Sequence, residues 1–170
     1  YGGMGFSEDT PMESAWRDAR IARIYEGTNE INRMLSVGML IKKAMKGHVD
    51  LLGPAMKVQE ELMGIPSFDT PDYSELFSEE KDMVAKLKKA FLMVAGAAVQ
   101  KYGMDLDAHQ QLLTAAADML IEIYIAESTI LRTEKLAKKQ GEDNTKEQIA
   151  MAKLYLYKAV DIVTQKGKES

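Results

Sequence analysis

Hydrophobic residues recur at helical spacing throughout the second half of the chain, and this pattern constrains the fold more than any other feature. Residues that recur every three or four positions lie on one side of an α-helix. Three such stretches occur, separated by short segments centred on Gly103 and Gly141. Short connections place consecutive helices antiparallel. We therefore predict an all-α fold in which residues 78–170 form an antiparallel up-down helical bundle.

The apolar residues of the middle helix lie on two faces, whereas those of the outer two form a single stripe each. A helix with two apolar faces needs a neighbour on both, so we expect the middle helix to be central. The stripes comprise Val84, Leu87, Phe91, Val94, Ala98 and Tyr102 in the first helix; Leu112, Ala116, Met119, Ile123 and Ile130 on one face of the second, with Leu113, Ala117, Leu120, Tyr124 and Leu131 on the other; and Ile149, Ala152, Leu156, Val160 and Val163 in the third.

Polar residues mark the expected starts of these three helices. Side chains with an oxygen acceptor satisfy the free amides of a first helical turn. Ser78 is expected to cap the first helix, and Asp105 or Asp107 the second, which should run to about residue 139. Asn144, with Glu147 three residues later, is expected to cap the third as a capping box.

The first half of the chain predicts shorter helices. Pro11 suits the first turn of a helix through Asp18, because a proline there loses no hydrogen bond. Trp16, the sole tryptophan, is expected to anchor this helix by burial. Thr28 is the expected N-cap of a second helix that runs to about Lys46.

Glycine and proline divide the chain into three parts. Gly47 and Gly53-Pro54 interrupt the helical pattern, a short helix then continues to about residue 63, and residues 64–78 are the best linker candidate. We predict a first part over 1–46, a connecting segment over 47–77 and a helical extension over 78–170.

Composition excludes several functions. The 22 Lys and Arg are outnumbered by 26 Asp and Glu, which argues against a nucleic-acid binder because phosphate recognition needs a concentrated positive charge. Cysteine is absent, so disulfides, thiolate metal sites and cysteine nucleophiles are ruled out. His48 and His109 are too few and too far apart to predict a metal site. A chain without disulfides suits a reducing compartment.

Glu26 is the carboxylate whose setting suggests chemistry. It lies beside the apolar Ile24 and Tyr25 and just before Gly27 and the predicted cap at Thr28. Apolar neighbours raise the pKa of a carboxyl towards the range of a general base, whereas a helix N-terminus lowers it. The pattern alone therefore leaves two interpretations open, a general base or a structural glutamate at a helix start.

Three blocks of sequence resemble one enzyme family. Residues 1–6 (YGGMGF), 17–21 (RDARI) and 24–31 (IYEGTNEI) match, in order and spacing, the C-terminal segment of the acyl-CoA dehydrogenases, flavoenzymes of fatty-acid oxidation. The resemblance implies that residues 1–46 are the end of the C-terminal helical domain of that family. It also implies that the chain, which does not begin with Met, comes from a longer enzyme whose other domains are missing here.

The resemblance implies a role for each matching residue. Glu26 would be the base that removes the α-proton of an acyl-CoA thioester while the flavin takes a hydride from the β-carbon, and its backbone N–H would bind the thioester oxygen. Gly27 would let the substrate approach closely. The FAD-binding residues would be Thr28, Asn29 and Glu30 at the helix start, together with Gly2 and Gly3, which match a glycine pair that contacts the FAD of a neighbouring subunit.

Residues beyond the first part resemble the very-long-chain type of the family. Residues 96–101, Asp107, 110–111 and 115–118 are similar to its extra C-terminal helical domain, which implies long-chain substrates. Residues 39–63 would be the segment that relatives place at a membrane surface, although acidic residues offset its lysines, so packing on the enzyme itself is the expected alternative. Gly38 stands where some members have an arginine near the substrate, and no role is assigned to it.

The resemblance implies an oxidoreductase that acts on CH–CH groups, with an electron-transferring flavoprotein or a similar acceptor as its partner and a homodimer as its full-length form. The expected location is the cytoplasm of a bacterium, or the mitochondrion of a eukaryote. We expect the 170 residues alone to be inactive. The alternative hypothesis is a non-catalytic helical module for oligomerisation or membrane-surface docking.

Overall fold

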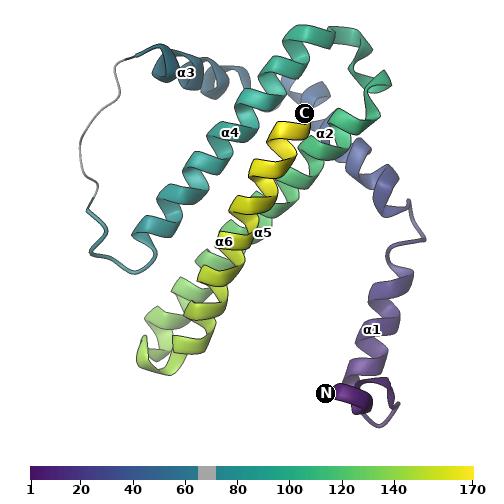
Figure 1. Cartoon of the computed structure of the whole chain (residues 1–170), viewed down its shortest axis with the longest axis vertical. Helices are drawn as coiled ribbons and strands as arrows, with labels where there is room; N and C mark the ends of the chain where they lie inside the picture. The colour runs from purple at the N-terminus through teal and green to yellow at the C-terminus, as the bar shows by residue number, and fades with distance from the viewer. Residues whose placement is uncertain (65–71) are drawn as a thin grey trace.

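Every regular element in the described residues, 1–64 and 72–170 of the computed structural model, is helical, as predicted. Residues 65–71, within the predicted linker, lie outside the described residues. The elements in chain order (Figure 1) are the 3-10 helix η1 (Gly2–Phe6), α1 (Pro11–Ile21), α2 (Asn29–Met45), α3 (Leu52–Met63), α4 (Ser78–Tyr102), the 3-10 helix η2 (Gly103–Ala108), α5 (Gln110–Gln140), the 3-10 helix η3 (Asp143–Thr145) and α6 (Lys146–Glu169).

Helix α5 is central, as predicted, because α2, α4 and α6 all pack against it. Figure 1 shows α6 returning alongside α5 after the tight turn at η3. Helix α4 packs against both α5 and α6. The predicted single stripes of α4 and α6 face this core, which includes Phe91, Leu156 and Val163. On α5 the first predicted face is buried through Met119, Ile123 and Ile130. The periodicity therefore placed the core correctly.

The second apolar face of α5 is covered along only half of its length. Leu113 and Ala117 are buried, but Tyr124 is 70% exposed and Leu131 is 52% exposed. Helix α2 meets α5 near Asp118, where Arg33 forms an ion pair with it. Beyond that point the part of the chain described here supplies no helix to cover this face.

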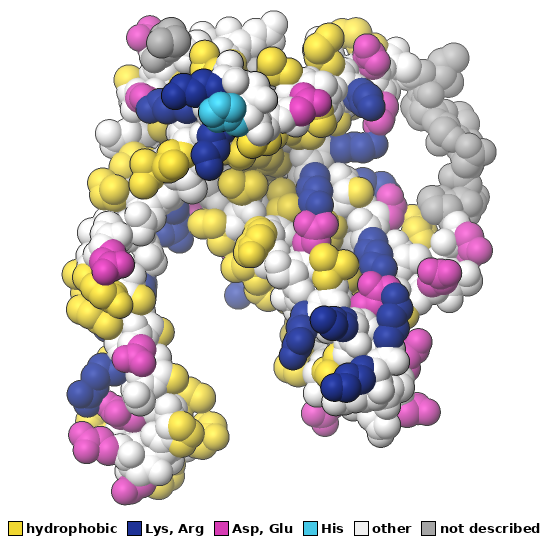
Figure 2. Space-filling model, turned by 180° about the vertical axis from the view of Figure 1, so that it is seen from behind, with side chains coloured by type: hydrophobic (Ala, Val, Ile, Leu, Met, Phe, Trp, Pro, Cys, Tyr) yellow, Lys and Arg dark blue, Asp and Glu magenta, His cyan; other side chains and the backbone are white. Residues whose placement is uncertain are grey.

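Residues 1–27, which we call the N-terminal arm, project from the helices of the second half (Figures 1 and 2). Helix α1 packs against η1. Trp16 is 67% exposed, so the prediction that it anchors the helix by burial is wrong in this chain. The physical reason is that the arm has no larger apolar surface to pack on. The exposed apolar side chains of the arm are Tyr1, Met4, Phe6, Met12, Trp16, Ile21, Ile24 and Tyr25.

The predicted caps of the later helices are wrong, although the helices themselves are present. Ser78 lies inside the first turn of α4 and donates its hydroxyl to the carbonyl of Glu75. Asp105 and Asp107 lie in η2, and α5 begins only at Gln110. Asn144 donates its amide back to the carbonyl of Gln140 instead of capping α6. Ser78 and Asn144 thus bond to neighbouring carbonyls, whereas Asp107 pairs with Lys42 of α2.

Helix α3 packs against α4, and Lys89 pairs with Glu61 across the contact. Gly53 and Pro54 lie in the first turn of α3 instead of interrupting it, because Asp50 accepts a hydrogen bond from the Gly53 amide (2.9 Å) and the helix tolerates proline there. Among the described residues no helix combines the length and the hydropathy needed to cross a bilayer. Contact of residues 39–63 with a membrane surface stays a prediction.

Candidate functional site

A tight turn carries the chain from α1 into α2 and contains the predicted base, Glu26. The end of α1 is closed by the amide of Ile24, which donates to the carbonyl of Ile21 (2.9 Å). The amide of Asn29 then reaches back to the carbonyl of Arg23 (3.2 Å). This second bond bridges the base of the loop, so the residues between its two ends form one closed turn.

Two consecutive residues of this turn have a left-handed backbone. Glu26 has φ 56° and Gly27 has φ 90°. Glycine adopts this conformation freely, but a glutamate pays a steric penalty of about 1–2 kcal/mol. Phe77 is the other non-glycine residue with positive φ in the described chain, and it is 1% exposed. Burial of a phenyl ring offsets the strain at Phe77, whereas the exposed Glu26 gains no such compensation.

Asn32, one turn into α2, folds back onto the strained residues. Its side-chain amide nitrogen donates to the Gly27 carbonyl (2.8 Å). Its Oδ1 lies 2.6 Å from the position that a Cβ at residue 27 would occupy. A larger residue at position 27 is therefore excluded both by the positive φ and by this close contact.

Thr28 caps α2, as predicted. Its hydroxyl oxygen accepts a hydrogen bond from the amide of Ile31 (3.3 Å). The pKa of the Glu30 carboxyl is held below its usual range, first by its own backbone amide and then by the Thr28 hydroxyl. The amides of Asn29 and Ile31 thus already have partners, the Arg23 carbonyl and the Thr28 hydroxyl.

The predicted site residues fall into two groups in space. Residues 26–30 are brought together in the turn and the first turn of α2. Gly2 and Gly3 lie in η1, at the far end of α1 (Figure 1). An 11-residue helix is about 16 Å long, so the two groups do not form one site within this chain. Both glycines present open backbone, with no atom within 4 Å of an added Cβ.

Comparison with known proteins identifies the family. The model described as "Acyl-CoA dehydrogenase, C-terminal domain" matches residues 86–170, which is half of the chain, and a second model with this description matches residues 1–40. The chain belongs to the acyl-CoA dehydrogenase family. The second match contains every predicted site residue.

Relatives within the acyl-CoA dehydrogenases cover the whole of this chain. A probable acyl-CoA dehydrogenase of Bacillus subtilis is 39% identical over all 170 residues, which make up 28% of that protein. A crystal structure titled as an acyl-CoA dehydrogenase complexed with FAD, from Bacillus anthracis, matches 99% of this chain with 41% identity and a TM-score of 0.83, over 28% of its own chain. The chain thus spans little more than a quarter of the length of these relatives.

Relatives of the short-chain type match a shorter stretch of the chain. The short-chain specific mitochondrial enzyme of Bos taurus is 54% identical over 41 residues, which are 24% of this chain and 10% of that enzyme.

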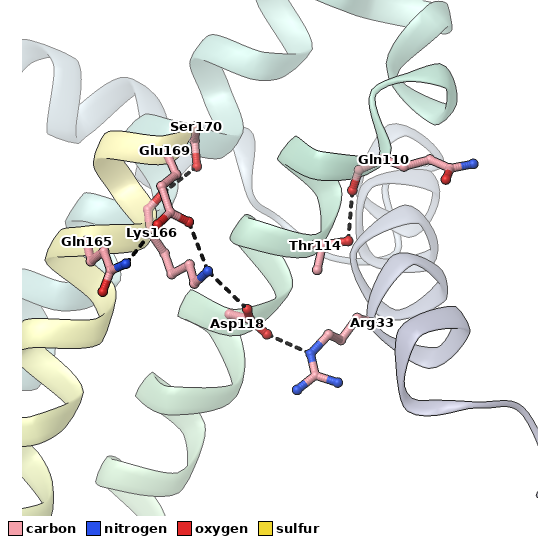
Figure 3. A network of polar contacts seen from close by, with 8 residues as sticks. All are labelled: Arg33, Gln110, Thr114, Asp118, Gln165, Lys166, Glu169 and Ser170. Carbon is pink, nitrogen blue, oxygen red and sulfur yellow. Dashed lines mark hydrogen bonds and ion pairs between the residues drawn. The ribbon is translucent and has the colours of Figure 1, made fainter. Parts of the chain in front are cut away.

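A polar network links α2 of this acyl-CoA dehydrogenase chain to its last helix (Figure 3). Arg33 of α2 donates through Nε to the Asp118 carboxylate of α5 (2.6 Å), and Lys166 of α6 lies 3.8 Å from the other oxygen. Lys166 also pairs with Glu169 (2.9 Å). Neither Asn32 nor Arg33 was singled out by sequence. The available signal for Asn32 was its position four residues after the cap, on the same helix face as Thr28.

The described residues offer no cluster of three or more His, Asp or Glu side chains that could hold a metal ion. They also form an apolar groove of about 470 Å³ between the end of α2, α3 and α4, lined by side chains that include Ile41, Leu52, Met56 and Met93. None of the predicted site residues lines this groove.

Proposed function

We propose that the chain is the C-terminal part of an FAD-dependent acyl-CoA dehydrogenase, in which Glu26 removes the α-proton of an acyl-CoA thioester. The observation that supports this role is the strained, exposed backbone of Glu26 in a turn closed by hydrogen bonds on both sides. Strain without compensating burial is typical of functional residues. The family membership supplies the reaction.

The chemistry needs a carboxylate in a fixed position. An α-proton beside a thioester is weakly acidic, so the base must be held against it and the developing enolate oxygen must receive a hydrogen bond. The carboxylate and the backbone N–H of Glu26 would supply these two functions. Gly27, which has no side chain, would let the thioester lie against the turn.

The residues proposed to hold FAD fit that group in part. Thr28, Asn29 and Glu30 begin α2, where the helix dipole favours a phosphate, although the Asn29 and Ile31 amides already have partners. The open backbone at Gly2 and Gly3 fits close contact with a cofactor of a neighbouring subunit. When bound, FAD supplies the acceptor for the β-hydride.

The 170 residues alone would be inactive. All residues proposed for catalysis and FAD binding are exposed or half-buried, and the described residues supply no wall to exclude water from Glu26. The alternative function, a helical module for oligomerisation or surface docking, describes these residues by themselves and is favoured by the exposed apolar side chains of the N-terminal arm. Both functions hold if the helical module is part of the enzyme.

The finer features of the function are also proposals. The similarity of residues 96–118 to the very-long-chain type supports long-chain substrates, which bleaching of the flavin by acyl-CoAs of graded length would test. A homodimer and an electron-transferring flavoprotein or similar acceptor follow from the family.

The proposed base is tested in the longer enzyme loaded with FAD. Glu26→Gln should retain the flavin but slow its bleaching by acyl-CoA by about 10²–10⁴-fold, because an amide cannot accept the proton. Glu142→Gln, which changes an exposed glutamate between α5 and α6, should bleach at the normal rate. Normal bleaching of Glu26→Gln would remove the proposed role.

A further inference from the structure

The left-handed backbone at Glu26 requires something to hold it, because neither burial nor glycine accounts for it. Two hydrogen bonds are available for this purpose. The Asn29 amide donates to the Arg23 carbonyl and closes the turn at its base. The Asn32 side chain donates to the Gly27 carbonyl (2.8 Å), directly after the strained residue.

The second bond acts closest to Glu26. The peptide group between Gly27 and Thr28 contains the carbonyl that Asn32 holds, so this bond limits rotation of the Gly27 backbone at φ 90°. Asn32 Oδ1 lies 2.6 Å from the position that a Cβ at residue 27 would occupy, so this side chain also leaves room only for glycine there. The cap at Thr28 does not hold the left-handed residues in this way. Its hydroxyl accepts from the Ile31 amide, so this hydrogen bond involves neither Glu26 nor Gly27.

We propose that Asn32 is a positioning residue for Glu26, which it serves by fixing the Gly27 carbonyl and with it the left-handed pair at 26 and 27. This proposal rests on the proposed role of Glu26 as the base. Asn32 itself is not expected to touch the substrate or the flavin. Its effect would reach the reaction through the direction of the Glu26 carboxylate and of the Glu26 backbone N–H.

The proposed role of Asn32 depends on the amide donor of its side chain. Aspartate has nearly the same shape as asparagine but no amide donor, and it would place a carboxylate oxygen beside the Gly27 carbonyl oxygen. Alanine removes the donor without adding a charge. Asn144 provides a matched control, because its side-chain amide also donates to a backbone carbonyl, that of Gln140, over 2.8 Å and far along the chain from the turn.

The test compares Asn32→Ala, Asn32→Asp and Asn144→Asp in the longer enzyme loaded with FAD. Since a misplacement of about 1 Å can cost 10²-fold in rate, we expect both Asn32 variants to lower kcat roughly 10- to 100-fold while KM and flavin content stay near those of the parent enzyme. Asn144→Asp should leave kcat unchanged. Wild-type kcat in Asn32→Ala, or an equal loss of kcat in Asn144→Asp, would overturn the proposal.

The two proposals fail in different ways. If Glu26→Gln bleaches normally, Glu26 is not the base and the proposed function falls with it. If Glu26→Gln stops bleaching while Asn32→Ala retains wild-type kcat, the base stands and only the positioning role is refuted. A loss of flavin together with kcat in Asn32→Ala would indicate damage to the helix start and would also count against a specific positioning role.

Discussion

A hydrogen bond made by Tyr155 joins helices α5 and α6. Its hydroxyl, on α6, donates to the Glu122 carboxylate on α5 (2.7 Å). Burial, and next the hydrogen bond to Glu122, raise the pKa of Tyr155 from 10.0 to about 12. The folded chain therefore holds this proton more strongly than the unfolded chain does.

Alkaline pH should expose this effect. Because the folded pKa is the higher one, the stabilisation is complete below pH 10 and is lost as the pH rises from 10 to about 12. A pKa difference of about two units between the folded and the unfolded chain contributes on the order of 2 kcal/mol to the free energy of unfolding. Urea denaturation across this window should show a shallower decline in Tyr155→Phe than in the parent chain. The pKa of Lys153 is also raised, so its deprotonation lowers the stability of the chain over alkaline pH as well. If the free energy of unfolding falls equally steeply in Tyr155→Phe and in the parent chain, the decline belongs to such lysines.

At the candidate site, sequence predicted the cap at Thr28 but not the backbone conformation of Glu26. Thr28 was identified as the cap because its hydroxyl and the following helix are both local features. The left-handed φ of Glu26 was not predicted, since no local rule assigns it to a glutamate. Asn32 was missed for a related reason, because its role depends on where the turn brings the Gly27 carbonyl.

Among the helices, ion pairs connect α4 to α5 and to α6. Lys81 pairs with Glu134 and Lys88 with Glu127 of α5, while Glu80 accepts from Lys153 of α6 (2.7 Å). Glu80 differs from the others because its side chain is only 3% exposed. A buried carboxylate is costly when it loses its partner.

Removing Lys153 should therefore cost more than removing an ordinary surface lysine. We expect Lys153→Met to lower the free energy of unfolding by about 2 kcal/mol, less than for a fully buried pair because Lys153 is partly exposed. The double variant Glu80→Leu with Lys153→Met should recover most of this loss. Lys158→Met, on the exposed side of the same helix, serves as the control in thermal or chemical denaturation. Additive losses in the double variant would contradict a coupled pair.

The helices were predicted more accurately than their ends. Apolar spacing located all of the later helices because burial of a stripe depends on many residues at once. Their caps depend on single side chains in connections of a few residues. There, Asn144 donates to the last carbonyl of α5, that of Gln140, and Thr145 donates to the Gly141 carbonyl that follows it; the sequence does not distinguish this from capping α6.

For the whole molecule, the N-terminal arm and the uncovered face of α5 leave large apolar side chains exposed. Trp16, Phe6 and Tyr25 on the arm and Tyr124 on α5 are all more than half exposed. Exposed apolar surface of this extent marks an interaction site. In the proposed enzyme, its remaining domains or a second subunit would cover the arm.

Trp16 reports on this covering because it is the sole tryptophan of the chain. In the isolated 170 residues we expect red-shifted fluorescence that iodide quenches readily. In the longer enzyme, with any other tryptophans replaced by phenylalanine, burial of the arm should shift the emission to the blue and reduce quenching. Trp16→Phe in each form provides the blank. Identical emission and quenching in both forms would show that the arm stays exposed.

The network of Arg33, Asp118 and Lys166 also bears on the order of events at the ribosome. Lys166 is synthesised 133 residues after Arg33 (166 minus 33), a delay of roughly 7 to 27 s at ordinary rates of translation. The turn that contains Glu26 therefore emerges long before the helices that hold α2 in place. Support of the turn that contains the proposed base is therefore a late step of biosynthesis, and a ribosome that stops early releases the motif without it.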